Sequence, residues 1–393
     1  MMSAASLAPT VSWAADGDEA RGIRVGSFLV RPSFAVGETY DSNIFLEDSG
    51  ENDSFLTTFT PDLLIESNWN RHALRLELGS ELGFFTHDSD DDYFDHNAAL
   101  SGVLDVTRKM RIRGRFGYLH DHEARGTVDV PTSLAEPVEF DEFNGSIVGE
   151  MEFGRFRFEA FGNAADLDFE DTERILGGKS NEDDRDRVAA EGGVELGYGV
   201  REGYEVFVRG SYLVTDYDDA LDDSGLDRDS TGFRVLGGLK VDLTRLVEAS
   251  VGAGYLERDY DDPSLSNSNG FAVDAGVKWS VTPITTVFLS ANREINETTL
   301  SGASGADTLA GEIAVKHELR RNLTLRASSG YAEFDYDGIS RVDDIYSAGF
   351  GAEWRITRRL TLEPSYDFQL RDSNEGNLDY TDHRATLSVK YGF

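Results

Sequence analysis

Apolar residues recur at every second position from residue 28 onward, in windows of roughly ten residues. A period of two is typical of β-strands, whereas an amphipathic helix has a period of about 3.6 residues. Similar windows begin at Leu74, Tyr204 and Phe271. The pattern predicts long strands, each with one apolar and one polar face. In the clearest window the apolar positions are Leu360, Leu362, Pro364, Tyr366, Phe368 and Leu370.

Two kinds of connection alternate between these windows. Short turns, most of them carrying Arg or Lys, occur near residues 70–71, 108–109, 154–155, 201–202, 244–245, 282–283, 320–321 and 358–359. Longer connections rich in Asp occur at 88–95, 182–186, 216–229, 259–262 and 335–344. With a first strand at about 28–40 and a last strand at about 379–393, the chain is expected to contain about 18 strands.

An even number of antiparallel strands with short turns at one end and long loops at the other is typical of a bacterial outer-membrane barrel. We therefore predict an all-β transmembrane barrel over residues 28–393, with short turns and both termini periplasmic and acidic loops extracellular. A soluble sandwich or propeller is the competing fold, because its strands show the same alternation. Prolines interrupt a strand ladder, so we expect bulges at Pro32, Pro61 and Pro364.

Two features favour the membrane barrel over a soluble fold. The chain ends with apolar residues on one face of the last strand, Leu387, Val389, Tyr391 and Phe393, which resemble the signal read by the barrel-assembly machinery. Three tryptophans, Trp69, Trp279 and Trp354, fall on apolar faces close to short turns. Such residues are expected to form a periplasmic aromatic girdle at the lipid interface.

Composition narrows the class of protein further. The 393 residues include 37 Lys+Arg and 73 Asp+Glu, and a net charge of −36 excludes nucleic acid as a partner. The absence of cysteine excludes disulfides and thiolate chemistry. Residues 1–15 resemble a signal peptide that is shorter than usual, as if its first residues were missing. Residues 16–27 would then be a periplasmic N-terminal segment. No apolar run is long enough for a membrane helix.

A barrel of about 18 strands is too wide for wall side chains to fill, so its lumen is either a water-filled channel or plugged. Opposite charges on neighbouring strands would form ladders that stiffen the wall, whereas the row Arg111, Arg113 and Arg115 could instead select anions or guide an anionic chain. The charged candidates for the lumen wall are Arg111, Arg113, Arg115, Arg157, Glu159, Glu205, Arg209, Arg326, Glu363 and Asp367.

The connection at 122–140 is expected to be the longest and is the third long loop. In general porins the third loop folds inward and narrows the pore, although an ordinary extracellular loop fits the sequence equally well. The acidic loops are expected either to bind divalent ions loosely beside lipopolysaccharide or simply to repel neighbouring anions. None has the spacing of a calcium loop, so no specific metal site is predicted in them.

The sequence offers little for catalysis. His120 and His122 are two apart on a strand and could share a metal, but a solvated loop edge is the commoner role for such a pair. The stretch 302–305 lacks the glycine spacing and the strand–turn–helix context of a nucleophile elbow. We therefore expect no enzyme activity, no cofactor and no specific metal site.

The residues from Gly26 to Phe34 and from Tyr40 to Phe45, with the basic turns and the terminal Tyr391-Gly392-Phe393, resemble the putative β-barrel porin 2 family of outer-membrane proteins. The resemblance covers essentially the whole mature chain. It implies an outer-membrane pore for exopolysaccharide or capsule export, working with a periplasmic polysaccharide export protein that has no membrane-spanning part. A general diffusion porin and a closed structural or adhesive barrel are the alternatives.

Overall fold

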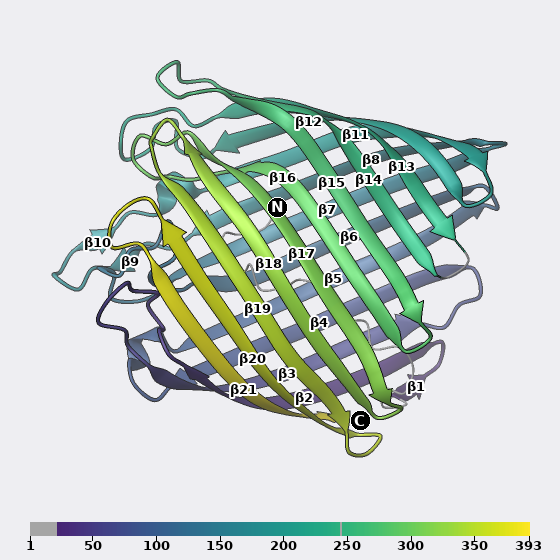
Figure 1. The fold of residues 1–393 in the computed structure, drawn as a ribbon, viewed down its shortest axis with the longest axis horizontal. Helices are drawn as coiled ribbons and strands as arrows, with labels where there is room; N and C mark the ends of the chain where they lie inside the picture. Colours follow the sequence, from purple (N-terminus) through teal and green to yellow (C-terminus); the bar gives the residue numbers. More distant parts are fainter. Residues whose placement is uncertain (1–21, 244–245) are drawn as a thin grey trace.

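A computed structural model describes residues 22–243 and 246–393 of the chain. The strands in these ranges form a closed antiparallel barrel of 18 strands (Figure 1). No helix in the described ranges is long and apolar enough to span a membrane. The barrel strands are β2 Phe28–Asp41, β3 Ser54–Ser67, β4 His72–Phe85, β5 Tyr93–Thr107, β6 Met110–Glu123, β7 Val138–Phe153, β8 Phe156–Phe169, β11 Arg187–Arg201, β12 Tyr204–Tyr217, β13 Ser230–Leu243, β14 Val247–Tyr260, β15 Ser268–Thr282, β16 Thr285–Asn296, β17 Gly305–Arg320, β18 Leu323–Asp337, β19 Val342–Arg355, β20 Leu360–Ser373 and β21 Tyr380–Gly392.

The first and last barrel strands close the sheet. β2 pairs with β21 from Ser33↔Gly392 to Asp41↔Arg384, and β2 also pairs with β3 along its whole length. A short strand that the sequence did not predict, β1 (Ile23–Val25), continues the β2 ladder beyond the end of β21. Each strand of the barrel therefore has a partner on both sides, which is what a membrane without water requires of the backbone.

The alternation of short turns and long loops is confirmed, except that the turn at 244–245 lies outside the described residues. Register shifts occur beside four of the short turns, on β5, β11, β15 and β17. The long connections are 42–53, 86–92, 124–137, 170–186, 218–229, 261–267, 297–304, 338–341 and 374–379.

Two expectations about the long loops are corrected. The longest of these connections is 170–186, which contains the small hairpin β9 (Thr172–Glu173) and β10 (Lys179–Ser180), and not the loop at 124–137. The loop expected at 335–344 shrinks to 338–341, because β18 and β19 continue through their acidic ends and pair there.

The bulges expected at the prolines are absent from the described ladders. Pairing of β3 with β4 skips Pro61 and resumes in the same register, and pairing of β19 with β20 does the same around Pro364. Pro32 lies just beyond the last β21 pair, where its carbonyl accepts a hydrogen bond from the Phe393 N–H. The strands therefore tolerate a missing donor without changing register.

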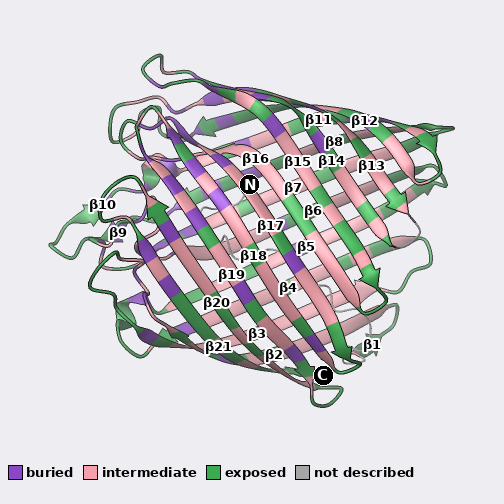
Figure 2. Ribbon diagram, viewed as in Figure 1, coloured by how far each residue is buried: buried purple, intermediate pink, exposed green. Residues whose placement is uncertain are grey.

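Burial divides the barrel along its axis (Figure 2). Large apolar side chains are exposed all around the outer wall, for example Phe116, Val208 and Phe350. Buried positions gather toward the long-loop end, where two apolar clusters lie inside the wall. The outer wall thus presents the apolar surface that lipid requires, and tight packing is concentrated at one end of the lumen.

Candidate functional site: the lumen and its two ends

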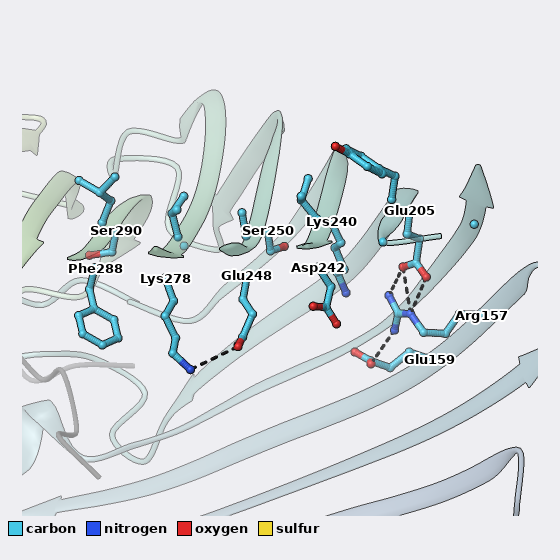
Figure 3. Close-up of a pocket in the computed structure, with 18 of the residues that line it drawn as sticks. Arg157, Glu159, Glu205, Lys240, Asp242, Glu248, Ser250, Lys278, Phe288 and Ser290 are labelled. Atoms are coloured by element: carbon cyan, nitrogen blue, oxygen red, sulfur yellow. Dashed lines mark hydrogen bonds and ion pairs between the residues drawn. The ribbon is translucent and has the colours of Figure 1, made fainter. Parts of the chain in front are cut away.

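The charged wall of the lumen centres on Arg157 of β8 (Figure 3). Its Nε lies 3.0 Å from Oε1 of Glu205 and its Nη1 3.0 Å from Oε2 of Glu159. It also pairs with the fully buried Glu195, whose carboxylate lies 2.8 Å from Arg209 and 2.6 Å from Lys240. Four neighbouring strands, β8, β11, β12 and β13, are thereby cross-linked on their inner face.

The arginine row on β6 is also matched by carboxylates. Arg111 lies 2.9 Å from Asp105, Arg113 lies 3.2 Å from Glu150, and Arg115 lies 3.1 Å from Glu77. All three guanidinium side chains remain 42–52% exposed. The row is therefore a ladder of solvated ion pairs. On the opposite part of the wall, Arg326 pairs with Glu353 at 2.5 Å. Glu363 lines a cavity together with these two residues. Asp367 is exposed on β20.

The short-turn half of the lumen is open. A cavity of about 1100 Å³ is lined by Arg113, Arg157, Glu159 and Glu205, and another of about 880 Å³ by Arg115, Arg326 and Glu363 among others. Side chains of both signs face these spaces, as Figure 3 shows for Arg157, Glu159, Glu205, Lys240 and Glu248. This half can hold water and hydrophilic solutes, and it is not dominated by one sign of charge.

The long-loop end of the lumen is filled by residues 124–137, which we call the lid. Val130 and Leu134 of the lid are buried against Phe140 and Phe169 of β7 and β8. Val128 packs instead on the apolar cluster formed by the ends of β17, β18 and β19. In the ring of 18 strands these elements lie on nearly opposite sides. The third loop therefore folds inward and crosses the lumen.

Buried ion pairs fix the base of the lid. Arg125 bonds Asp91 of the 86–92 loop, with Nε 2.8 Å from Oδ1, and its Nη1 donates to the Leu134 carbonyl. Its guanidinium also lies over the Phe45 ring, with Cζ 4.2 Å from the centroid. Gly126 (φ +90°) comes so close to the Phe45 carbonyl that a side chain would clash with it. Burial raises the pKa of Asp91, although Arg125 opposes that shift.

The far edge of the lid meets the loop 297–304. Thr298 donates a hydrogen bond of 2.8 Å from Oγ1 to Asp129 of the lid. Arg228 holds that loop by donating to the carbonyls of Thr298 and Ala303 at 2.6 and 3.0 Å. Glu297 in turn pairs with Arg258 of β14. The closure is a network of several loops that meet above the lumen.

The 170–186 loop contacts both the lid and the strand ends beside it. In the lid, the Ala135 N–H donates to the Glu173 carbonyl at 2.8 Å. At the end of β6, Arg185 makes the second contact. Arg185 pairs with Glu123 at 2.6 Å and stacks over Phe169, with Cζ 4.0 Å from the ring centroid. The neighbouring Asp186 accepts a hydrogen bond from the Phe169 N–H, and burial raises the pKa of its carboxyl to about 6. Sequence reasoning missed Arg125, Arg185 and Arg228. The available signal was an isolated arginine within an acidic loop.

Exposed aromatic side chains gather at both ends of the barrel. Trp69, Trp279 and Trp354 are 45–47% exposed at the short-turn end. A second set of exposed aromatic side chains, which the sequence analysis missed, surrounds the long-loop end, with pairs such as Tyr40–Phe55 and Phe233–Tyr255. On the last strand, Leu387, Val389, Tyr391 and Phe393 all lie exposed on the outer wall. Two aromatic bands are the arrangement expected of a lipid-embedded barrel.

His120 and His122 do not share one site among the described residues. Nδ1 of His120 lies 2.9 Å from Asp141, whereas Nδ1 of His122 lies 3.0 Å from Asp95. The stretch 302–305 is the end of a loop that enters β17, with Ala303 and Ser304 buried.

A closed barrel with an apolar outer wall, two aromatic bands and cavities lined by charged residues defines an outer-membrane channel of porin type. The sequence from residue 17 to residue 393 matches the family described as putative beta-barrel porin 2. The chain belongs to that family, and its fold places it in the bacterial outer membrane.

Solved structures with similar folds are outer-membrane proteins of low sequence identity. The outer membrane protein OpdK of Pseudomonas aeruginosa is 10% identical, with a TM-score of 0.47, and the match covers 93% of this chain and 99% of that one. OccAB3 of Acinetobacter baumannii is 11% identical, with a TM-score of 0.47, over 94% and 100% of the two chains. The siderophore receptor PirA of Pseudomonas aeruginosa is 9% identical, with a TM-score of 0.44, over 93% and 80%. No curated protein sequence matches the chain.

Proposed function

We propose that this channel is the outer-membrane conduit for an exopolysaccharide or capsular polymer, loaded from the periplasm by a periplasmic polysaccharide export protein. In this proposal the short turns and both termini face the periplasm and the acidic loops face outward. The resemblance to the porin family associated with polysaccharide export supports the substrate class. The asymmetry of the lumen supports the direction of transport.

That asymmetry is the observation that carries the proposal. The wide spaces of about 1100 and 880 Å³ are in the half that would face the periplasm, where the polymer arrives. The lid lies at the opposite end, where a resting barrier would keep external solutes out between export events. Paired charges of both signs along the wall suit a polymer with many hydroxyl groups, because they offer hydrogen bonds without holding one sign of charge tightly.

The same orientation assigns the surfaces that meet the envelope. The acidic loops would lie beside lipopolysaccharide, with divalent ions shared loosely between them. The exposed residues of β21, ending at Phe393, would be read by the barrel-assembly machinery. The exposed Trp69, Trp279 and Trp354 would contact the periplasmic lipid interface.

Deletion of the gene tests the proposal in the cell. Secretion of the polymer should be lost, and uptake of small hydrophilic solutes should be unchanged. Complementation with the intact chain should restore secretion, whereas a chain in which the lid is tied to the wall by an engineered disulfide should restore it only under reducing conditions. Normal secretion in the deletion strain, with impaired solute uptake, would contradict the export role.

A general diffusion porin is the second candidate, because a third loop held inward by buried ion pairs is also how a pore for small solutes is narrowed. The two roles differ in the lid. A diffusion porin should conduct steadily in planar bilayers with the lid in place, whereas an export conduit should stay closed until the lid moves.

A further inference from the structure

A cluster of ligand-type side chains lies on the ends of β5 and β6, just below the lid. Nδ1 of His122 is 3.0 and 3.1 Å from the two carboxylate oxygens of Asp95 and 3.8 Å from Oδ1 of Asp121. One ligand atom from each residue falls within 4.8 Å of the other two. On a tetrahedral zinc ion with bonds of about 2.1 Å, two ligand atoms are roughly 3.4 Å apart. The donors are already close to that spacing.

Neighbouring contacts fix the orientation of these donors. The Tyr93 ring is stacked on the His122 ring, with centroids 4.2 Å apart, and the His122 backbone N–H donates to Asp121 at 2.9 Å. The Tyr93 hydroxyl donates to Glu81 at 2.7 Å, and Glu81 is the register partner of Asp95 on β4. Such supporting contacts are typical of metal sites, where they hold the ligands in place.

The charge of the cluster is unbalanced. Within the described ranges, neither Arg nor Lys forms an ion pair with Asp95 or Asp121, and His122 is the one base in ion-pair distance of both. Elsewhere in the lumen the carboxylates are matched, as Glu195 is by Arg157, Arg209 and Lys240. Two carboxylates at one imidazole, both partly shielded from solvent and with no arginine or lysine paired to them in the described ranges, leave a negative charge that a bound cation would balance.

We propose that Asp95, Asp121 and His122 bind one divalent transition-metal ion of the Zn²⁺ type, beside Glu81, the register partner of Asp95. An imidazole nitrogen in the donor set favours zinc-like ions over Ca²⁺ and Mg²⁺, which prefer oxygen ligands. Binding replaces the proton on Nδ1 of His122, so affinity should fall as the pH is lowered. The ion would tie β5 to β6 immediately before the lid begins at residue 124.

Titration of the intact, detergent-solubilised barrel with ZnCl₂ after treatment with EDTA tests the proposal. Calorimetry should show a site of one ion per chain in the wild type, while CaCl₂ should not displace it. His122→Gln should weaken this site at least about tenfold, the scale of change seen when even supporting contacts of a metal site are lost. Co²⁺ as the probe should give the absorption bands of a low-coordinate site with nitrogen and oxygen ligands.

His120→Gln is the matched control, because His120 lies on the same strand but contacts Asp141. It should bind Zn²⁺ like the wild type. Asp95→Asn provides a second test if His122→Gln assembles poorly, and heat-modifiable migration on gels reports assembly of each variant. A wild type that binds no Zn²⁺, or equal affinity in His122→Gln and His120→Gln, would overturn the proposal.

Discussion

The two ends of the lumen are built from the same residue types with opposite results. In the short-turn half, ion pairs such as Arg113–Glu150 and Arg115–Glu77 have side chains 22–50% exposed and border open cavities. At the long-loop end, the side chains of Arg125–Asp91, Arg185–Glu123 and Arg228–Asp222 are at most 9% exposed. Two of these arginines also lie over aromatic rings, Arg125 over Phe45 and Arg185 over Phe169.

The difference in burial changes what an ion pair contributes at each end of the lumen. Solvated ion pairs contribute little free energy each, so the open half can exchange its partners with a passing solute. Buried ion pairs add little net stability when intact, but losing one partner costs several kcal/mol because a bare charge is left without water. The long-loop end is therefore specified in one arrangement. In the short-turn half, the solvated pairs of the arginine row on β6 are permissive, whereas the cluster of Arg157 with the buried Glu195 is fixed.

The largest effect is expected from a charge placed inside the lid. Leu134→Asp should unseat the lid, because an unpaired carboxylate at a position 1% exposed costs several kcal/mol. The expected result in planar bilayers is a large rise in conductance. Leu176→Asp, at a fully exposed position in the neighbouring β9–β10 hairpin, should leave conductance unchanged. Equal conductance for both variants would show that the lid does not close the lumen.

Removal of one latch should have the next largest effect. Arg125→Met leaves Asp91 buried without its partner, which should destabilise the packed lid by about 3–5 kcal/mol. Limited proteolysis of the lid and the open fraction in bilayers would both increase. The double variant Arg125→Met with Asp91→Asn should recover much of the loss, and failure to recover would assign the effect to lost packing on Phe45.

A change of pH should shift the open fraction of the channel by a smaller amount, through the Asp186 carboxyl at the long-loop end. The Asp186 carboxyl has its pKa raised to about 6 by burial, so the packed loop binds a proton that an open loop, with an ordinary pKa near 3.8, does not. Packing is therefore favoured below about pH 6 and weakened as the pH rises through 6. The open fraction should be lower at pH 5 than at pH 7.5, and Asp186→Asn should show a smaller change. An open fraction that rises on acidification would contradict this sign.

The smallest effect is expected in the open half. Arg115→Gln removes a half-exposed cation whose pair with Glu77 is solvated. In a lid-open background, the anion-to-cation permeability ratio should fall by less than about fivefold, since such pairs are worth at most about 1 kcal/mol. A larger shift would show that the arginine row acts as a selectivity filter and would narrow the contrast between the two ends.

Much of the barrel could be read from the sequence because strand alternation and turn chemistry are local. The window from Leu360 to Leu370 and the ending at Phe393 depend only on a period of two, and Tyr366 and Phe393 are exposed in the structure. The alternation could not set the limits of β18 and β19, where Asp335 and Asp343 continue the ladder. Acidic residues at these positions resemble a loop in the sequence, but they belong to strands because each pairs with a residue of the neighbouring strand.

The class of fold, the approximate number of strands and the two faces of each strand follow from the amino-acid sequence, because each depends on periodicity over a few residues. The tertiary structure alone decided that residues 124–137 cross the lumen, that Arg125 meets Asp91, and that His122 meets Asp95. These contacts join segments far apart along the chain, and their partners are fixed only when the barrel closes and brings the loops together at one end.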